Sequence, residues 1–292
     1  MALTTAKVKL PSSVVTDLIA KAKDSSTIAA LSPSTPQVFA DTTHLIFNPS
    51  AEAEVVDEGA KKGSYEQTLT PVEGKRVKVV TTTRVTDELK WADEDNKLQI
   101  VQSILDDQNA ALGRAIDYVI YHAVNPKTGG ALSGYTALTA GATAVTATDD
   151  CVADVDSMAD ALIDYDVTGI ALSRPFASTL RKVRVPSTGL RLYPEIPLNL
   201  SVGDFDGIPA ATSGTVNGRL ATTPTKALAI MGDFNLIKWG MVRDIWSEII
   251  EYGDPDQTGV DLKANNQIAY RTEAVFSFAV LDPKGFAVLK SA

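Results

Sequence analysis

A long segment with the periodicity of an amphipathic helix, residues 92–123, constrains this fold more than any other feature. At 1.5 Å per residue, about 30 helical residues span ~45 Å. Acids at Asp93, Glu94 and Asp95 fit the first turn, where the helix dipole favours negative charge. We therefore expect one long helix whose apolar stripe packs on a sheet of its own domain. Gln108 is the one polar break in that stripe. The core residues predicted for the helix are Leu98, Val101, Leu105, Leu112, Ile116 and Val119.

A second feature is a polar hairpin over residues 51–83. Two β-like runs flank a tip at 57–64, DEGAKKGS, which holds two glycines, two lysines and two acids. The returning run, 75–85, alternates like a strand. Such a hairpin has little to bury against its own domain, and elements of that kind are usually buried against a neighbour.

The remaining segments suggest separate structural units. Residues 11–24 have the pattern of a short amphipathic helix, and the Ser-, Thr- and Pro-rich residues after it are typical of an extended arm. Strands and helices alternate over 126–232, which predicts a compact α/β unit. Residues 233–292 are rich in strand patterns, and the last two strands flank a turn at 282–285.

Composition limits the classes of function. The net charge of −9 argues against global attraction to nucleic acid, which needs a concentrated basic face. The single cysteine, Cys151, excludes an intrachain disulfide and favours a reducing compartment. The first residues lack the apolar core of a secretory signal, and no run approaches ~18 apolar residues, so we expect no membrane span.

Motifs that could carry chemistry are incomplete. Glycines at 129–134 have phosphate-loop spacing, but Tyr135 stands where the lysine is required. Residues 254–259 open like a calcium loop, but Asn265 replaces the bidentate glutamate, so a surface turn is the favoured interpretation.

The nucleophiles and imidazoles are also scarce. His44 and His122 lie far apart in sequence, which argues against a zinc site or a histidine-based triad. Cys151 lies in the first turn of a predicted helix, where a packing role is favoured over a reactive thiol. We therefore expect no enzyme activity, no catalytic residues, no cofactor and no metal.

The order of several segments resembles the major capsid protein of tailed double-stranded DNA bacteriophages, the fold named after phage Hong Kong 97. Residues 51–89 are similar to that family's extended loop and to the entry of its spine helix. DYVIYHAVNPKTGGALSG is similar to the end of the spine helix, and TGIALSRPFASTLRKVR to a strand and helix of the axial domain. MGDFNLIKWGMVRDIWSEI is similar to the strand that returns to the peripheral domain.

The resemblance implies an α+β fold and a division of the chain. It comprises an N-terminal arm at 1–50, an extended loop at 51–83, a peripheral domain with its spine helix at 84–125, an axial domain at 126–232, and peripheral strands with a peripheral loop at 233–292. The implied function is structural: self-assembly through pentamers and hexamers into an icosahedral head that encloses double-stranded DNA. An encapsulin-type compartment shares the fold and is the first alternative; a soluble α/β enzyme that uses carboxylates is the second.

The resemblance also implies contacts between subunits. The tip would meet a neighbour through Glu58, Gly59, Lys61, Lys62 and Tyr65. The family prototype joins a loop lysine covalently to an asparagine of a neighbour's peripheral loop. Here the stretch 253–262 has no asparagine. We therefore expect a non-covalent shell in which Asp254 and Asp256 pair with the tip lysines.

The implied partners are copies of this chain, a portal protein and packaged DNA bound without sequence specificity. Because no scaffold-like domain precedes the arm, scaffolding is expected to be a separate protein or dispensable, and decoration proteins are allowed. The protein would be located in the virion after assembly in the host cytoplasm.

Overall fold

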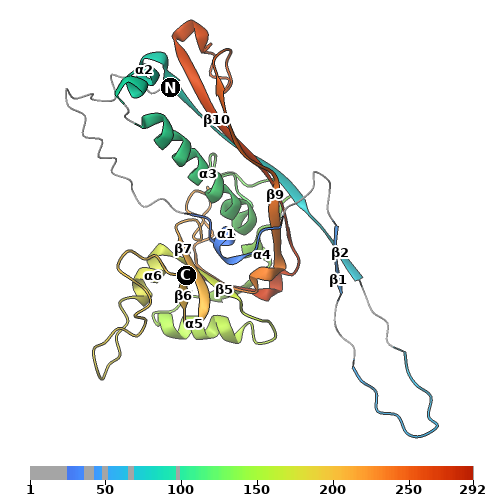
Figure 1. The fold of residues 1–292 in the computed structure, drawn as a ribbon. Coiled ribbons are helices and arrows are strands. Elements are labelled where there is room, and N and C mark those ends of the chain that lie inside the picture. The colour runs from blue at the N-terminus through green and yellow to red at the C-terminus, as the bar shows by residue number, and fades with distance from the viewer. Residues whose placement is uncertain (1–24, 36–42, 48–51, 65–68, 97–98, 292) are drawn as a thin grey trace.

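The computed structural model describes residues 25–35, 43–47, 52–64, 69–96 and 99–291. Its helices and sheets form an elongated body from which a hairpin projects (Figure 1). A three-stranded antiparallel sheet runs along the upper part, and a six-stranded sheet with two helices forms the lower part. The fold is therefore mixed α and β, as the sequence predicts.

The three-stranded sheet has the order β3-β10-β9, comprising β3 (Lys75–Thr86), β9 (Ile237–Ile250) and β10 (Gln267–Val280). Central β10 pairs antiparallel with both neighbours, and with β3 the register runs from Gln267↔Thr86 to Phe278↔Lys75. The sequence analysis assigned residues up to 83 to the projecting hairpin. That assignment is wrong for β3, because its alternating residues pair with β10 in this sheet.

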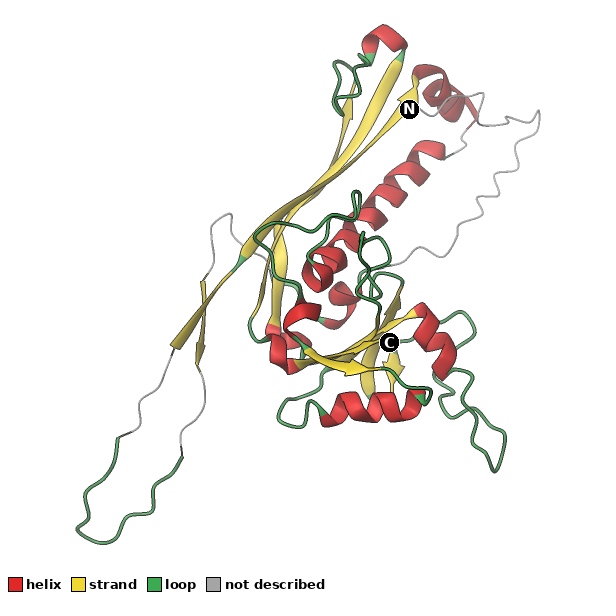
Figure 2. Ribbon diagram, turned by 180° about the vertical axis from the view of Figure 1, so that it is seen from behind, coloured by secondary structure: helices red, strands yellow, loops and turns green. Residues whose placement is uncertain are grey.

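Helix α3 (Ile100–His122) lies against the sheet, as both views show (Figure 2). The predicted single helix over 92–123 is in fact two helices, because α2 (Asp87–Asn96) ends before α3 begins. Gln99 adopts a left-handed conformation with φ 57° at the junction. Asp93 of α2 accepts hydrogen bonds from the N–H groups of Ile100 and Val101 at 2.8 and 3.2 Å. It thus caps α3 from outside, satisfying donors that a helix start leaves unpaired.

The six-stranded sheet has the order β4-β11-β8-β5-β7-β6. Its strands are β4 (Thr143–Thr146), β5 (Gly169–Ser173), β6 (Asp204–Phe205), β7 (Ile208–Ser213), β8 (Ala227–Gly232) and β11 (Phe286–Lys290). Its helices are α5 (Cys151–Asp160) and α6 (Arg174–Leu180), with α4 (Leu138–Gly141) before β4. Short 3₁₀ turns are η2 (Phe234–Leu236), η3 (Lys263–Asn265) and η4 (Pro283–Gly285).

The last strand departs from the predicted division of the chain. The turn η4 does separate β10 and β11, but these strands enter different sheets. β11 pairs with β8 and β4 of the six-stranded sheet, although it belongs to the segment 233–292 that was assigned to the peripheral strands. One continuous apolar cluster under both sheets explains the crossing, since Phe276 of β10 and Phe286 and Val288 of β11 are all fully buried in it.

Part of the arm is a core element, which corrects the expectation of an extended arm. Helix α1 (Thr27–Leu31) places Ile28 in the main cluster with no exposed surface. Beyond it, the Ser32 hydroxyl donates to the carbonyl of Ile237 at 2.9 Å, and Trp239 Nε1 donates to the carbonyl of Ser32 at 3.2 Å. The predicted helix at 11–24 lies outside the described residues.

The projecting hairpin is built by β1 (Thr43–Phe47) and β2 (Leu69–Glu73), which pair antiparallel from Thr43↔Glu73 to Phe47↔Leu69. Residues 52–56, expected to be β-like, form no strand. The first strand therefore lies within the segment predicted as arm.

Candidate assembly surfaces

The tip of the hairpin presents its side chains to solvent. All of residues 52–64 are exposed, and Val55 retains 98% of its accessible surface. A turn is closed by the Ala60 N–H, which donates to the Asp57 carbonyl at 3.1 Å, and Gly59 has φ +80° there. That conformation favours glycine. Glu54 Oε2 accepts from the Gly63 N–H at 2.8 Å across the loop.

The predicted contact residues of the tip are placed accordingly. Glu58, Lys61 and Lys62 are exposed, and Gly59 forms the turn. Tyr65 lies outside the described residues. Val55 lies exposed in the same loop as two lysines and several acids, and its side chain is not buried against its own chain. The tip therefore has the composition of a contact surface.

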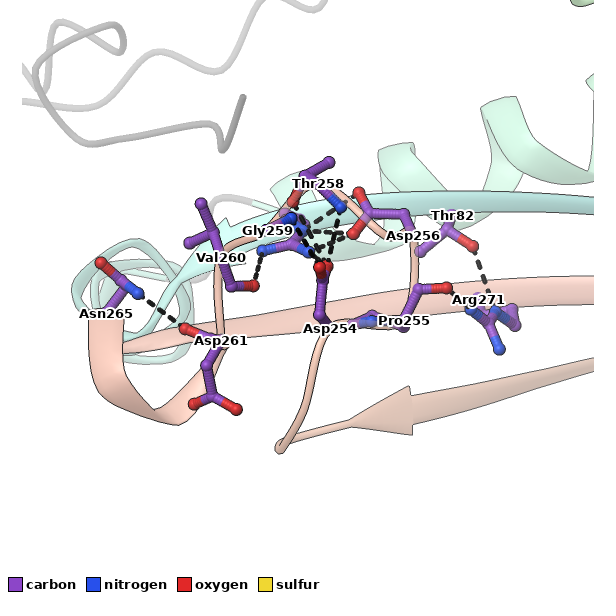
Figure 3. A network of polar contacts seen from close by, with 11 residues as sticks. Thr82, Asp254, Pro255, Asp256, Thr258, Gly259, Val260, Asp261, Asn265 and Arg271 are labelled. Carbon is purple, nitrogen blue, oxygen red and sulfur yellow. Dashed lines mark hydrogen bonds and ion pairs between the residues drawn. The ribbon is translucent and has the colours of Figure 1, made fainter.

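A second surface is the loop between β9 and β10, residues 251–266, whose polar contacts are drawn in Figure 3. Arg84 of β3 braces this loop from inside. Arg84 Nε donates to both carboxylate oxygens of Asp256 at 2.8 and 3.0 Å, and Nη1 donates to the Val260 carbonyl at 2.9 Å. Its Nη2 forms ion pairs with Asp254 and Asp256. The guanidinium is buried, and hydrogen bonding to Asp256 raises the pKa of Arg84 despite that burial.

Asp254 also organises the loop itself. Thr258 N–H donates to its Oδ1 at 3.0 Å and Gly259 N–H to its Oδ2 at 2.6 Å. Desolvation opposes its ionisation, but these N–H groups and Arg84 outweigh that effect and keep the pKa of Asp254 below its usual value. On the next strand, Arg271 Nη2 donates to the Pro255 carbonyl at 2.6 Å. The loop is therefore fixed to the sheet at several points.

This network changes the interpretation of Asp254 and Asp256. They were expected to pair with tip lysines of a neighbour, but in the structure their first partner is a buried arginine of the same chain. The pattern that suggested a calcium loop has the same explanation. Asn265, the nearest asparagine to the predicted contact, donates its amide to the Asp261 carbonyl at 2.7 Å.

The spine helix α3 buries the C-terminal part of its predicted core. Leu112, Ile116 and Val119 are buried, and Val101 and Leu105 are half-buried against Val85, Leu89, Ile268 and Tyr270. Leu98 lies outside the described residues. Gln108, the polar break in the stripe, is also buried: its amide donates to the Thr83 hydroxyl at 2.8 Å and the Tyr270 carbonyl at 3.0 Å, and its oxygen accepts from the Thr272 hydroxyl at 2.7 Å.

Asp117, a residue that the sequence analysis missed, joins the arm to the spine helix. Its carboxylate is fully buried and accepts from the Ser26 hydroxyl at 2.6 Å and from the N–H groups of Thr27 and Ile28 at 2.9 and 3.2 Å. The hydroxyl groups of Thr27 and Thr215 donate to it as well. Burial raises the pKa of Asp117, and the hydrogen bonds oppose that rise. An isolated acid within the otherwise apolar run 115–121 was the available signal.

His122 extends this buried network toward the six-stranded sheet. Its Nε2 lies 2.9 Å from the Thr215 carbonyl and its Nδ1 lies 3.0 Å from the Thr225 hydroxyl. A carbonyl only accepts, so Nε2 carries the proton and Nδ1 accepts from Thr225. Burial lowers the pKa of His122 to about 4, so the ring is neutral at neutral pH.

We expect His122 to make folding stability fall in acid. The pKa of His122 is about 4 in the folded chain and 6.5 for an unperturbed histidine, the value expected in the unfolded chain. As pH falls from 6.5 to 4, the unfolded state therefore binds the proton first. The stability that depends on neutral His122 is therefore present above pH 6.5 and is lost toward pH 4, by about 3 kcal/mol.

Chemical denaturation at pH 7 and pH 4 measures this loss. The pH-dependent decrease should be about 3 kcal/mol smaller in His122→Gln than in the wild type. Asp117, whose raised pKa acts in the opposite sense, is present in both proteins and cancels in the comparison. Equal decreases in the two proteins would show that His122 remains solvated.

Over the described residues, no group of three His, Cys, Asp or Glu side chains is placed to hold a metal ion. Cys151 is buried, and desolvation raises the pKa of its thiol, which disfavours the reactive thiolate. His44 lies in β1, far in sequence from His122 at the end of α3. No helix of the described part is long and apolar enough to cross a membrane.

Comparisons with known proteins agree with a structural role. The model of the phage capsid family matches residues 6–291. A solved structure from Mycobacterium phage Ogopogo is 34% identical, with a TM-score of 0.85 over 100% of both chains. One from Gordonia phage Cozz is 28% identical, with a TM-score of 0.81 over 99% of this chain and 93% of the other.

A more distant structure shares the fold alone. The chain titled "Capsid of empty GTA particle computed with C5 symmetry" is 12% identical, with a TM-score of 0.61 over 99% of this chain and 96% of that chain. A search among curated proteins found no match.

The exposed hairpin, the braced loop and the helix-backed sheet therefore belong to a structural protein of the kind that builds shells from repeated subunits, as the family match and the solved structures indicate. The chain belongs to the phage capsid family and is a major capsid protein, a component of the virion. Neither the compartment alternative nor the enzyme alternative is favoured by these comparisons.

Proposed function

We propose that this major capsid protein assembles through pentamers and hexamers into an icosahedral head around double-stranded DNA, and that its hairpin tip fastens neighbouring subunits. The supporting observation is the tip itself, which projects from the body and is exposed over residues 52–64 (Figure 1). Exposed ion pairs contribute only ~0–1 kcal/mol each. A closed shell repeats every contact and holds each subunit through several neighbours, so weak contacts give a strong particle.

In this proposal the parts of the chain have distinct roles. The three-stranded sheet with α3 forms the peripheral domain, and the six-stranded sheet forms most of the axial domain at the ring centres. Arg84 keeps the loop 251–266 in one shape, so that loop meets a neighbour as a rigid surface. Asp254 and Asp256 keep 26% and 28% of their side chains exposed, which still allows an outer contact with Lys61 or Lys62.

The proposed partners follow from the same assembly. A portal protein would replace one ring, and decoration proteins or a separate, dispensable scaffolding protein would act on the shell during its assembly in the host cytoplasm. The chain has a net charge of −9, which suits packaged DNA that must move freely and is not bound by sequence.

Expression of the chain alone, followed by negative-stain microscopy and sedimentation, tests the proposal. Uniform polyhedral shells are expected. A monomer or small oligomer under all assembly conditions would contradict the proposed self-assembly.

We also expect the shell to be non-covalent. The stretch 253–262 holds no asparagine, the acids at 254 and 256 bind Arg84, and the Asn265 amide donates within its own loop. Particles boiled in detergent should run as one band near the 31.0 kDa monomer. A ladder of covalent rings on that gel would show that an acceptor amide is reached after all.

A further inference from the structure

Charges are segregated along the segment that builds the six-stranded sheet. Residues 128–173 contain no lysine or arginine and seven aspartates: Asp149, Asp150, Asp154, Asp156, Asp160, Asp164 and Asp166. The next residues, 174–194, contain no acid and five bases: Arg174, Arg181, Lys182, Arg184 and Arg191. In a chain with a net charge of −9, the second block is an unusual concentration of positive charge.

The basic block ends in a projecting hairpin, residues 183–192, which we call the basic hairpin. Val185 N–H donates to the Leu190 carbonyl at 2.9 Å, and Leu192 N–H donates to the Val183 carbonyl at 3.1 Å. Gly189 has φ +68° in its turn. Arg184 is exposed, Leu190 keeps 67% of its surface and Leu192 keeps 39%. The hairpin therefore offers exposed aliphatic side chains beside guanidinium groups.

The acidic block has a matching feature in residues 160–166, the acidic turn, which connects α5 to β5. Asp160, Asp164 and Asp166 are exposed around Ile163, which keeps 83% of its surface. The turn is held in place by the Tyr165 hydroxyl, which donates to Asp282 Oδ2 at 2.8 Å, and by the buried Leu162.

The two features lie at opposite ends of β5. The acidic turn enters β5 near Gly169, which pairs with Gly232, and Gly232 in turn pairs with Phe286 next to η4. The other end of β5, Ser173, leads directly into α6, and the basic hairpin follows α6. In Figure 1 the chain after α6 projects to the lower left, away from the right-hand end of α5, where the acidic turn begins.

Unlike charges at opposite ends of one subunit cannot neutralise each other within it, but they suit head-to-tail association of identical subunits, which closes into rings. We propose that the basic hairpin of one subunit docks on the acidic turn of the next subunit around a ring. This inference rests on the proposed function and adds the residues of one ring contact. Leu190 packs against Ile163 of the neighbour, and Arg184 and Arg191 face its exposed aspartates. Complementary charges of this kind fix register and suppress wrong pairings.

Charge reversal tests the pairing. The first variant carries Arg184→Glu and Arg191→Glu, and the second carries Asp164→Arg and Asp166→Arg. Each brings like charges together at every ring contact, so shell yield should fall at least about tenfold. The four substitutions combined in one chain restore opposite charges, and shells should return. The charge-preserving control, Arg184→Lys with Arg191→Lys, should assemble like the wild type.

Mixing the two reversed variants in equal amounts gives a sharper result. Opposite charges then meet only where the variants alternate, and alternation closes in rings with an even number of subunits. Six-membered rings should form and five-membered rings should not, so electron microscopy should show sheets or tubes in place of closed shells.

Separate outcomes overturn the inference and the proposed function. Wild-type protein that forms no shells contradicts the proposed function. Normal shells from either reversed variant, or a folded combined variant that assembles no better than its parents, overturn the ring contact alone. If a reversed variant fails to fold by circular dichroism, Ile163→Ser and Leu190→Ser replace it. Both alter exposed side chains, and each should reduce shell yield while leaving the melting temperature unchanged.

Discussion

Replacing residues 57–64 with a short Gly-Ser turn should abolish shells and leave the subunit folded. All of these residues are exposed, so the free energy of unfolding should change by less than about 0.5 kcal/mol. Assembly should fail because the replacement removes one contact from every subunit of a shell held by many weak contacts. Sedimentation measures assembly, and chemical denaturation of the unassembled subunit measures stability.

A matched control separates the tip's chemistry from its length. Lys61→Arg with Lys62→Arg keeps both charges and the loop, so it should form shells like the wild type. Normal shells from the shortened protein would show that the tip has no part in assembly.

Asp117→Ala should lower the free energy of unfolding more than any other single substitution considered for this chain. It removes the acceptor for the buried Ser26 hydroxyl, the N–H groups of Thr27 and Ile28, and the Thr215 hydroxyl. A buried donor left without a partner costs about 1–3 kcal/mol, so a total near 3–5 kcal/mol is expected after partial relaxation. The arm around α1 should also detach from α3 and become open to limited proteolysis.

Asp106→Ala is the control for this substitution. Asp106 is an exposed acid on the same helix that accepts one hydrogen bond from Gln102, so its loss should cost less than about 0.5 kcal/mol. If Asp117→Ala and Asp106→Ala are equally stable, and the arm is equally resistant to protease in both, the buried carboxylate does not hold the arm.

Local patterns in the sequence predicted single elements well. The motif TGIALSRPFASTLRKVR formed a strand and a helix, β5 and α6, as the resemblance implied. The periodicity of the spine helix was also detected. Its interruption was not, because apolar spacing continues through the junction and the left-handed Gln99 is neither glycine nor proline. There the side chain of Asp93 caps α3 from outside the helix, a contact that apolar spacing does not reveal.

Partners distant in sequence were beyond pattern analysis. An alternating strand fits any antiparallel neighbour, so nothing local indicated that β3 pairs with β10. Arg84 lies 172 positions before its partner Asp256 in the sequence, and Asp117 lies 91 positions after Ser26. The outward-facing tip was predictable for the opposite reason, since its polar composition already excludes burial within its own chain.

Hydrogen–deuterium exchange of the tip, measured in free subunits and in assembled shells, tests the central claim most directly. The claim is that residues 52–64 are exposed in one subunit and become buried by a neighbour on assembly. Amides in this segment should exchange rapidly in the free subunit and be protected in the shell, while amides of β10, already paired on both sides, should be protected in both. Equally rapid exchange of the tip in free subunits and shells would contradict the account.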